Sequence, residues 1–248
     1  MNKKIFWLSI AAVIASFIGG FITANSLNRK DLSTLRAENE NLKNSQTATS
    51  KNNEELSLTE AEIRSRIAEA DRNPNNFGFQ KNLGLALYNY ATMKQDTELL
   101  AEVSRVLTRV YENNPSDYEA IVALGNINFD VGYFKKNNEN LQKAREFYQK
   151  ALKQKPKSAD VQTDLGLTYF LSNPPETDAA IVEFRKALEA NPKNEKTLEV
   201  LTQALLTQNK RDEAEKYIVR LREINPNNQI LTTVETPFRQ TENNLQKQ

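Results

Sequence analysis

The feature that most constrains this chain is the regular spacing of its Leu-Gly doublets and its prolines. The doublets Leu83-Gly84, Leu124-Gly125 and Leu165-Gly166 follow one another at intervals of 41 residues. Five of the eight prolines recur at intervals of 41, 41, 36 and 34 residues, at Pro74, Pro115, Pro156, Pro192 and Pro226. Regular intervals of this length are typical of a chain built from repeated structural units.

One complete unit runs from residue 159 to residue 192, and it predicts a helical hairpin. Leu165-Gly166 and Tyr169 open a first apolar stripe. Ala180, Phe184 and Ala187 form a second stripe at the i, i+4, i+7 spacing of a helix. Proline at the unit boundary suits a helix start or the residue after a helix end, where its missing N–H and fixed φ are tolerated. The repeats therefore predict pairs of helices and an all-α fold.

The glycine of each doublet falls in the middle of a predicted helix. Glycine there costs about 1 kcal/mol relative to alanine. Three glycines at one register therefore need a packing reason, and we expect the two helices of each hairpin to approach closely at that point.

These residues resemble the pattern of the tetratricopeptide repeat (TPR) family. The resemblance implies an α-solenoid of helical hairpins over residues 74–228, divided into four units. These units are residues 77–115, 118–156, 159–192 and 195–228. The first two are seven residues longer than the 34-residue standard, which we expect to lengthen both helices by about one turn. The last has Thr202 and Leu221 where the pattern prefers glycine and alanine.

Composition excludes several classes of function. The chain contains no Cys and no His, which removes thiol nucleophiles, histidine bases and the usual zinc ligands. Its 33 basic and 32 acidic residues give a formal charge of +1. The chain therefore lacks the excess of positive charge that is typical of nucleic-acid-binding proteins. The sequence predicts a protein that is not an enzyme and that needs no cofactor or metal.

An uncharged run of 20 residues, 5–24, is long enough to cross a bilayer as a helix. We predict a cytoplasmic tail at residues 1–4 and a transmembrane anchor at 5–26, which places the repeats on the extracytoplasmic, periplasmic side. A cleaved signal peptide is the competing interpretation, although its apolar core usually spans only about 7 to 15 residues. Small residues around Gly19 and Gly20 line one face of the run and would permit self-association through the span.

The remaining segments frame the repeats. Residues 27–56 predict a short polar helix and a flexible linker, and residues 57–73 predict an amphipathic helix that caps the first repeat. Residues 229–248 predict a last packed turn and a polar tail.

The family resemblance also implies where a partner binds. Such arrays are similar to one another in holding a peptide or a partner helix on a concave groove lined by the first helix of each hairpin. The lining implied here is Lys81, Leu85, Tyr88, Asn89, Val122, Asn126, Phe129, Asp130, Thr163, Leu167, Phe170, Glu199, Gln203 and Leu206. Tyr88, Phe129 and Phe170 share one register and could form an aromatic strip that anchors apolar side chains. Packing of these aromatics between neighbouring hairpins is the open alternative.

A subset of the family grips a C-terminal carboxylate with a set of Lys, Arg and Asn side chains. Lys81 and Asn126 fit that pattern, but Leu85 replaces an Asn, and Asp160 and Asp164 stand where two cations are needed. Two acids would repel a carboxylate, which argues against that mode of binding.

The sequence thus predicts a membrane-anchored scaffold or adaptor that binds a protein or peptide. Two alternatives stay open. The layout is similar to membrane-anchored TPR subunits of c-type cytochrome maturation, which hold apocytochrome. The chain could instead be a structural protein that forms homo-oligomers in the membrane.

Overall fold

The structure, a computed structural model, describes residues 59–231. In this range the chain forms nine α-helices and no strand. It divides into two compact units, residues 1–109 and 110–248, with the division inside helix α5. Each unit is described separately below.

The described part of unit 1 contains α3 (Glu60–Arg72), α4 (Phe77–Lys94) and most of α5 (Thr97–Asn113). Helix α3 corresponds to the expected cap helix and starts with a capping box, in which Thr59 and Glu62 satisfy each other's free backbone N–H groups. Its buried side chains are Ile63 and Ala70. Helices α4 and α5 form the first hairpin.

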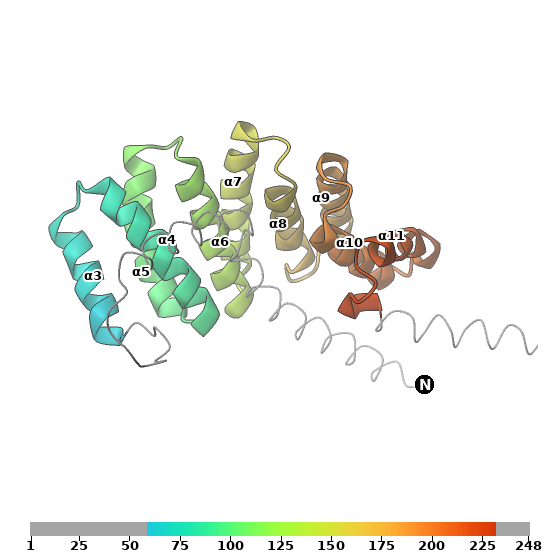
Figure 1. The fold of residues 1–248 in the computed structure, drawn as a ribbon, viewed down its shortest axis with the longest axis horizontal. Helices are drawn as coiled ribbons and strands as arrows, with labels where there is room; N and C mark the ends of the chain where they lie inside the picture. The colour runs from blue at the N-terminus through green and yellow to red at the C-terminus, as the bar shows by residue number, and fades with distance from the viewer. Residues whose placement is uncertain (1–58, 232–248) are drawn as a thin grey trace, which may run out of the picture. The chain divides into compact units, whose positions relative to one another are not determined.

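Unit 2 contains three hairpins in succession, coloured from green to red in Figure 1. Their helices are α6 (Tyr118–Phe134) and α7 (Asn138–Gln154), α8 (Ala159–Phe170) and α9 (Thr177–Ala190), and α10 (Glu195–Thr207) and α11 (Arg211–Ile224). Each helix packs against its hairpin partner, α7 packs against α8, and α9 packs against α10. Helices α8 and α10, the first helices of neighbouring hairpins, also touch. The described residues thus have the layered packing of a TPR-type helical solenoid.

The proline-containing spacers determine where the first helices begin. In each spacer the residue two positions after the proline is the N-cap of the next helix: Asn76 for α4, Asp117 for α6, Ser158 for α8 and Asn194 for α10. The Asn and Asp caps accept a hydrogen bond from a backbone N–H of the first turn, at 3.1 Å for Asn76 and 3.0 Å for Asp117 and Asn194. The spacing of the prolines therefore sets the period of the helices.

The glycines of the doublets lie where two helices of a hairpin meet, as expected. A Cβ atom built on Gly125 would lie 2.7 Å from a ring carbon of Tyr148, and one on Gly166 would lie 2.5 Å from a ring carbon of Phe184. In unit 1, a Cβ on Gly84 would lie 2.6 Å from the Leu107 side chain. Each glycine thus makes room for a large buried side chain of the facing helix.

The last hairpin solves the same packing problem with different residues. Thr202 occupies the glycine position of α10 and is fully buried, and its hydroxyl donates to the Leu198 carbonyl at 2.7 Å. At the position of Tyr148 and Phe184, α11 carries the smaller Ile218, which is 1% exposed. A larger residue on one helix is matched by a smaller one on the other.

The lengths of the helices confirm the interpretation of the insertions. The helices of the first two hairpins have 18, 17, 17 and 17 residues, whereas those of the last two have 12, 14, 13 and 14. The extra residues therefore add about one turn to each helix and leave the hairpins intact.

Several sequence predictions concern residues outside the described range. These are the cytoplasmic tail at 1–4, the anchor at 5–26, the linker at 27–56 and the polar tail from residue 232 onward. Across residues 59–231, no helix has both the length and the apolar character needed to cross a membrane.

Candidate partner-binding face

The first helices of unit 2, α6, α8 and α10, form what we call the first-helix face. Their N-terminal ends are linked by the cap residues of the spacers. The Tyr118 hydroxyl of α6 lies 3.4 Å from the Ser158 hydroxyl, and Asn194 Nδ2 donates to Asp160 Oδ1 of α8 at 2.8 Å. Asn228 Nδ2, after the last proline, donates to Glu195 Oε1 of α10 at 2.7 Å. Ser158 and Asn194 thus tie their own helices to the first helix before them, and Asn228 ties the turn after α11 to α10.

Helices α8 and α10 are joined by two further contacts. The hydroxyls of Thr163 and Thr197 lie 2.6 Å apart, and both side chains are fully buried. At the next position of α8, Asp164 Oδ1 pairs with Lys196 Nζ at 2.6 Å, and only 10% and 16% of these side chains are exposed. Such a shielded pair keeps most of its electrostatic attraction.

The structure places the expected groove residues at different depths. On unit 2, Val122, Asn126, Gln203 and Leu206 are half-buried and present part of their side chains on the surface. On unit 1, Lys81, Leu85 and Tyr88 are half-buried on α4, and Asn89 is exposed. The part they play in binding stays a prediction.

The other expected groove residues lie inside unit 2. Phe129, Asp130, Thr163, Leu167, Phe170 and Glu199 are between 0% and 8% exposed. Phe170 meets Phe184 of its own hairpin edge to face, with ring centroids 6.4 Å apart. The expectation of an exposed aromatic strip is therefore wrong for Phe129 and Phe170, whose rings are core.

The amide of Asn126 is partly committed to the fold. Its Oδ1 accepts a hydrogen bond from the Tyr148 hydroxyl at 3.0 Å, over the close approach at Gly125. An amide oxygen can accept two hydrogen bonds, so Asn126 keeps its amide donor and part of its acceptor capacity.

Glu199 has the most perturbed environment on the first-helix face. Burial is the main cause that raises the pKa of its carboxyl to about 7, and the neighbouring Glu195 carboxylate raises it further. The amide of Asn228 and the ammonium of Lys196 lower it. Asn228 donates to both Glu199 and Glu195 and is itself 6% exposed.

Sequence reasoning missed Asn228, Glu195 and Lys196 as parts of this face. A signal was present in the repeat of the spacers, because Asn228 stands two residues after Pro226 as Asn194 stands after Pro192. That position in the repeat predicts that Asn228 caps a helix. The hydrogen bonds from the Asn228 amide to Glu195 and Glu199 depend on the packing of α10 and could not be predicted from the repeat.

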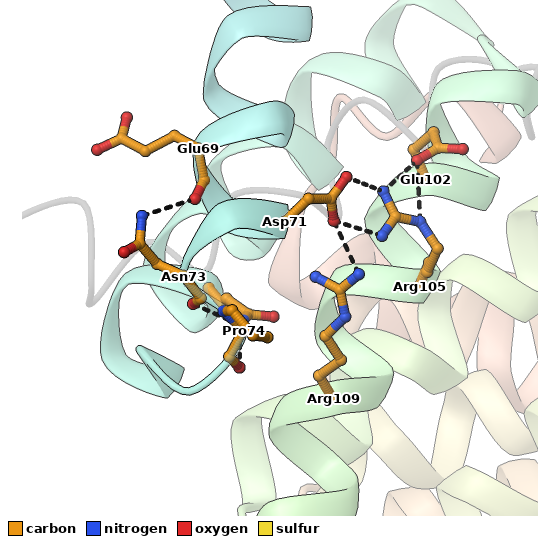
Figure 2. Close-up of polar contacts among 8 residues, drawn as sticks. Glu69, Asp71, Asn73, Pro74, Glu102, Arg105 and Arg109 are labelled. Atoms are coloured by element: carbon orange, nitrogen blue, oxygen red, sulfur yellow. Dashed lines mark hydrogen bonds and ion pairs between the residues drawn. The ribbon is translucent and has the colours of Figure 1, made fainter.

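A second polar cluster ties together the helices of unit 1. Figure 2 shows Asp71 of α3 pointing at two arginines of α5, with Arg105 Nη1 at 2.6 Å and Arg109 Nη2 at 2.7 Å from its Oδ1. Arg105 also pairs with Glu102 at 2.7 Å. These guanidinium groups hold the pKa of Asp71 down to about 2, mainly through the hydrogen bonds from Arg105 and then Arg109. The cluster holds the cap helix on the first hairpin.

Arg145 joins the second and third hairpins in a comparable way. Its guanidinium, on α7, donates to the hydroxyl and the carbonyl of Thr168 at 3.1 Å and 3.0 Å. It also pairs with Glu176 at 2.7 Å and stacks 3.9 Å from the centre of the Tyr169 ring. This buried arginine is fully engaged in packing and is not offered to a ligand.

The successive hairpins of unit 2, with polar links between their first helices, have the architecture of a TPR-type helical solenoid. Models of the tetratricopeptide repeat match residues 125–158 and residues 176–233. The chain therefore contains tetratricopeptide repeats, and these matches span under half of it.

Solved structures with the same fold include two described as MamA. A crystal structure of MamA is 22% identical to this chain, with a TM-score of 0.52, over 68% of this chain and 96% of that one. MamA 41-end from Desulfovibrio magneticus RS-1 is 16% identical, with a TM-score of 0.52, over 68% and 87%.

TTC0263, a thermophilic TPR protein in Thermus thermophilus, also shares the fold. It is 18% identical, with a TM-score of 0.52, over 71% of this chain and 88% of that one. At these identities the likeness concerns the fold alone. No curated protein matches the chain at a significant level.

Proposed function

We propose that this chain is a membrane-anchored scaffold that holds a polypeptide segment of a partner protein on the first-helix face. The observation that carries the proposal is the alignment of α6, α8 and α10 by their cap residues, with half-buried side chains on α6 and α10. Mixed apolar and polar side chains of this kind suit an extended peptide or a helix.

The accessible residues of that face differ in chemistry. Val122 on α6 and Leu206 on α10 offer apolar surface, and Asn126 and Gln203 offer amide groups.

The proposed anchor is the uncharged run at residues 5–24, with the repeats outside the cytoplasm. Tethering at the bilayer raises the effective concentration of the scaffold near partners in the same membrane. Protease added to sealed vesicles tests the orientation. The proposal requires that the repeats be digested in right-side-out vesicles and be protected in inverted ones.

Site-specific photocrosslinking in native membranes tests the binding face. A photoreactive residue replaces Val122, Gln203 or Leu206 one at a time. The matched control positions are Val182 on α9 and Val219 on α11, which are 48% and 42% exposed on second helices. We expect one protein to be captured from the first-helix positions and not from the control positions. Equal capture from both sets, or capture of lipid or self alone, would refute the proposed face.

A further inference from the structure

Charge in unit 2 is distributed unequally between first and second helices. Helices α6, α8 and α10 together carry six carboxylates and one ammonium group: Glu119, Asp130, Asp160, Asp164, Glu195 and Glu199 against Lys196. Helices α7, α9 and α11 carry nine acidic and ten basic residues and are close to neutral. The chain as a whole is also near neutrality, so the excess of negative charge belongs to the first helices.

The acids at the α8–α10 end are held mostly by neutral groups. Asn194 donates to Asp160, Asn225 and Asn228 donate to Glu195, and Asn228 donates to Glu199. An amide donor satisfies an oxygen atom and cancels no charge. The exception is Asp164, which is paired with Lys196.

The acids are also accessible to different degrees. Asp160 is exposed and Glu195 is half-buried, so both can meet a charged group of a partner at the surface. Glu199 is 8% exposed, so its ionised carboxyl acts on a partner mainly through its field, whereas Asp164, which is 7% exposed, is neutralised by Lys196. Because burial reduces screening, that field extends into any chain segment laid across α8 and α10.

We propose that the segment held on the first-helix face is cationic and places a lysine or arginine side chain against Asp160 and Glu195 of the α8–α10 end. The inference rests on the proposed function and specifies the chemistry of the partner. An acidic segment is disfavoured there, because the face supplies one ammonium group that is already paired with Asp164.

Glu199 provides an internal reporter of the bound charge. The groups that face it are Glu195 and Lys196 on its own helix and Asn228 of the following turn, with Asp164 of α8 bound to Lys196. Its pKa lies near 7 in the free protein, mainly because of burial. A cation placed beside Glu195 lowers that pKa, so binding near pH 7 releases a proton from Glu199.

The test uses the full chain in a nonionic detergent and a displayed library of random dodecapeptides. Enriched peptides are resynthesised with a fluorophore, and their affinities are measured by anisotropy at low and moderate salt. The acid-neutralising variant carries Asp160→Asn and Glu195→Gln, which keep an oxygen acceptor for Asn194 and Asn228. The matched control carries Glu146→Gln and Glu189→Gln, two exposed acids of second helices. Both variants change the net charge equally.

We expect the enriched peptides to carry a clear excess of Lys and Arg and to bind more weakly as salt rises. One exposed charge pair contributes up to roughly fivefold to the affinity, and the acid-neutralising variant removes two acids. We therefore expect this variant to bind the peptides about tenfold more weakly and the control variant to bind them as the parent chain does. Calorimetry at pH 7 in buffers of different ionisation enthalpy should detect proton release, which Glu199→Gln abolishes.

Two other outcomes would overturn the inference and are distinguishable. Enrichment of neutral or acidic peptides, with affinities that the acid-neutralising variant leaves unmoved, refutes the charge argument and leaves the scaffold function standing. Enrichment of no peptide at all counts against the inference and the proposed function together. Cationic peptides that bind without releasing a proton would refute the placement beside Glu199 and Glu195.

Discussion

The buried carboxyl of Glu199 makes the stability of the last hairpin depend on pH. Its pKa is raised from 4.5 to about 7 in the folded chain. Between these values the folded state retains a proton that the unfolded state has released, so the free energy of unfolding falls as pH rises from about 4.5 to about 7. A shift of this size corresponds to about 3 kcal/mol at most, at 1.36 kcal/mol for each pH unit.

The Glu199→Gln substitution isolates this effect. Glutamine keeps an oxygen that accepts the Asn228 amide and has no carboxyl to ionise. We therefore expect the variant to match the parent chain near pH 4 and to exceed its stability near pH 8 by about 2 to 3 kcal/mol. The gain should appear as slower amide exchange in α10 and α11 and as a higher urea midpoint by circular dichroism.

Urea suits the measurement because it is uncharged and does not screen the carboxylates, whereas guanidinium would. Glu189→Gln, an exposed acid on α9, serves as the matched control and should leave the pH dependence of the parent chain unchanged. The reasoning fails if Glu199→Gln keeps the full pH dependence of the parent, or if it is less stable than the parent at pH 8. Either result would mean that Glu199 is ionised in the fold without cost.

Further predictions concern packing and the two ionic clusters. Gly125→Ala and Gly166→Ala should each lower the free energy of unfolding in urea by about 1 to 3 kcal/mol, because the added methyl groups would collide with Tyr148 and Phe184. Gly78→Ala is the control and should not lower it, because the nearest atom to its Cβ lies 4.0 Å away. Asp71→Asn should lower the free energy of unfolding by under about 1 kcal/mol, since the ion pair with Arg105 is partly exposed. The parent chain should lose the same contribution as the pH falls from about 4 to about 2, because the Asp71 carboxylate is then protonated. Amide exchange in α3 measures both effects. Arg145→Met should cost about 1 to 3 kcal/mol by chemical denaturation, because it leaves the Thr168 carbonyl and hydroxyl without their donor.

The hairpins were predictable because their determinants are local. A proline fixes φ and cannot continue a helix, the polar residue two positions later caps the next helix, and a glycine marks a close approach. These three signals recur in the sequence and needed no knowledge of the rest of the fold. The insertion of seven residues was equally readable, since it added about a turn to each helix of the first two hairpins.

The exposure of the first helices was less predictable, because it depends on how many neighbours surround each helix. Helix α8 contacts α7, α9 and α10, and ten of its twelve residues are buried. The family register assigns Thr163, Leu167 and Phe170 to the groove, but packing against α10 and α9 covers Thr163 and Phe170. One signal was available in the sequence. Helix α8 carries only two charged residues, Asp160 and Asp164, and a helix with so few is buried on most sides.

The cap asparagines connect the predictable part of the fold with the unpredicted part of the face. Asn194 uses its oxygen to start α10 and its amide to hold Asp160, and Asn228 uses its oxygen for the N–H of Ile230 and its amide for Glu195 and Glu199. One residue thus fixes the period of the helices and stabilises an acid without neutralising it. The cap of α8 is Ser158, whose hydroxyl reaches the Tyr118 hydroxyl instead of a carboxylate. The negative field of the first-helix face is therefore concentrated where the caps are asparagine, between α8 and the turn after α11.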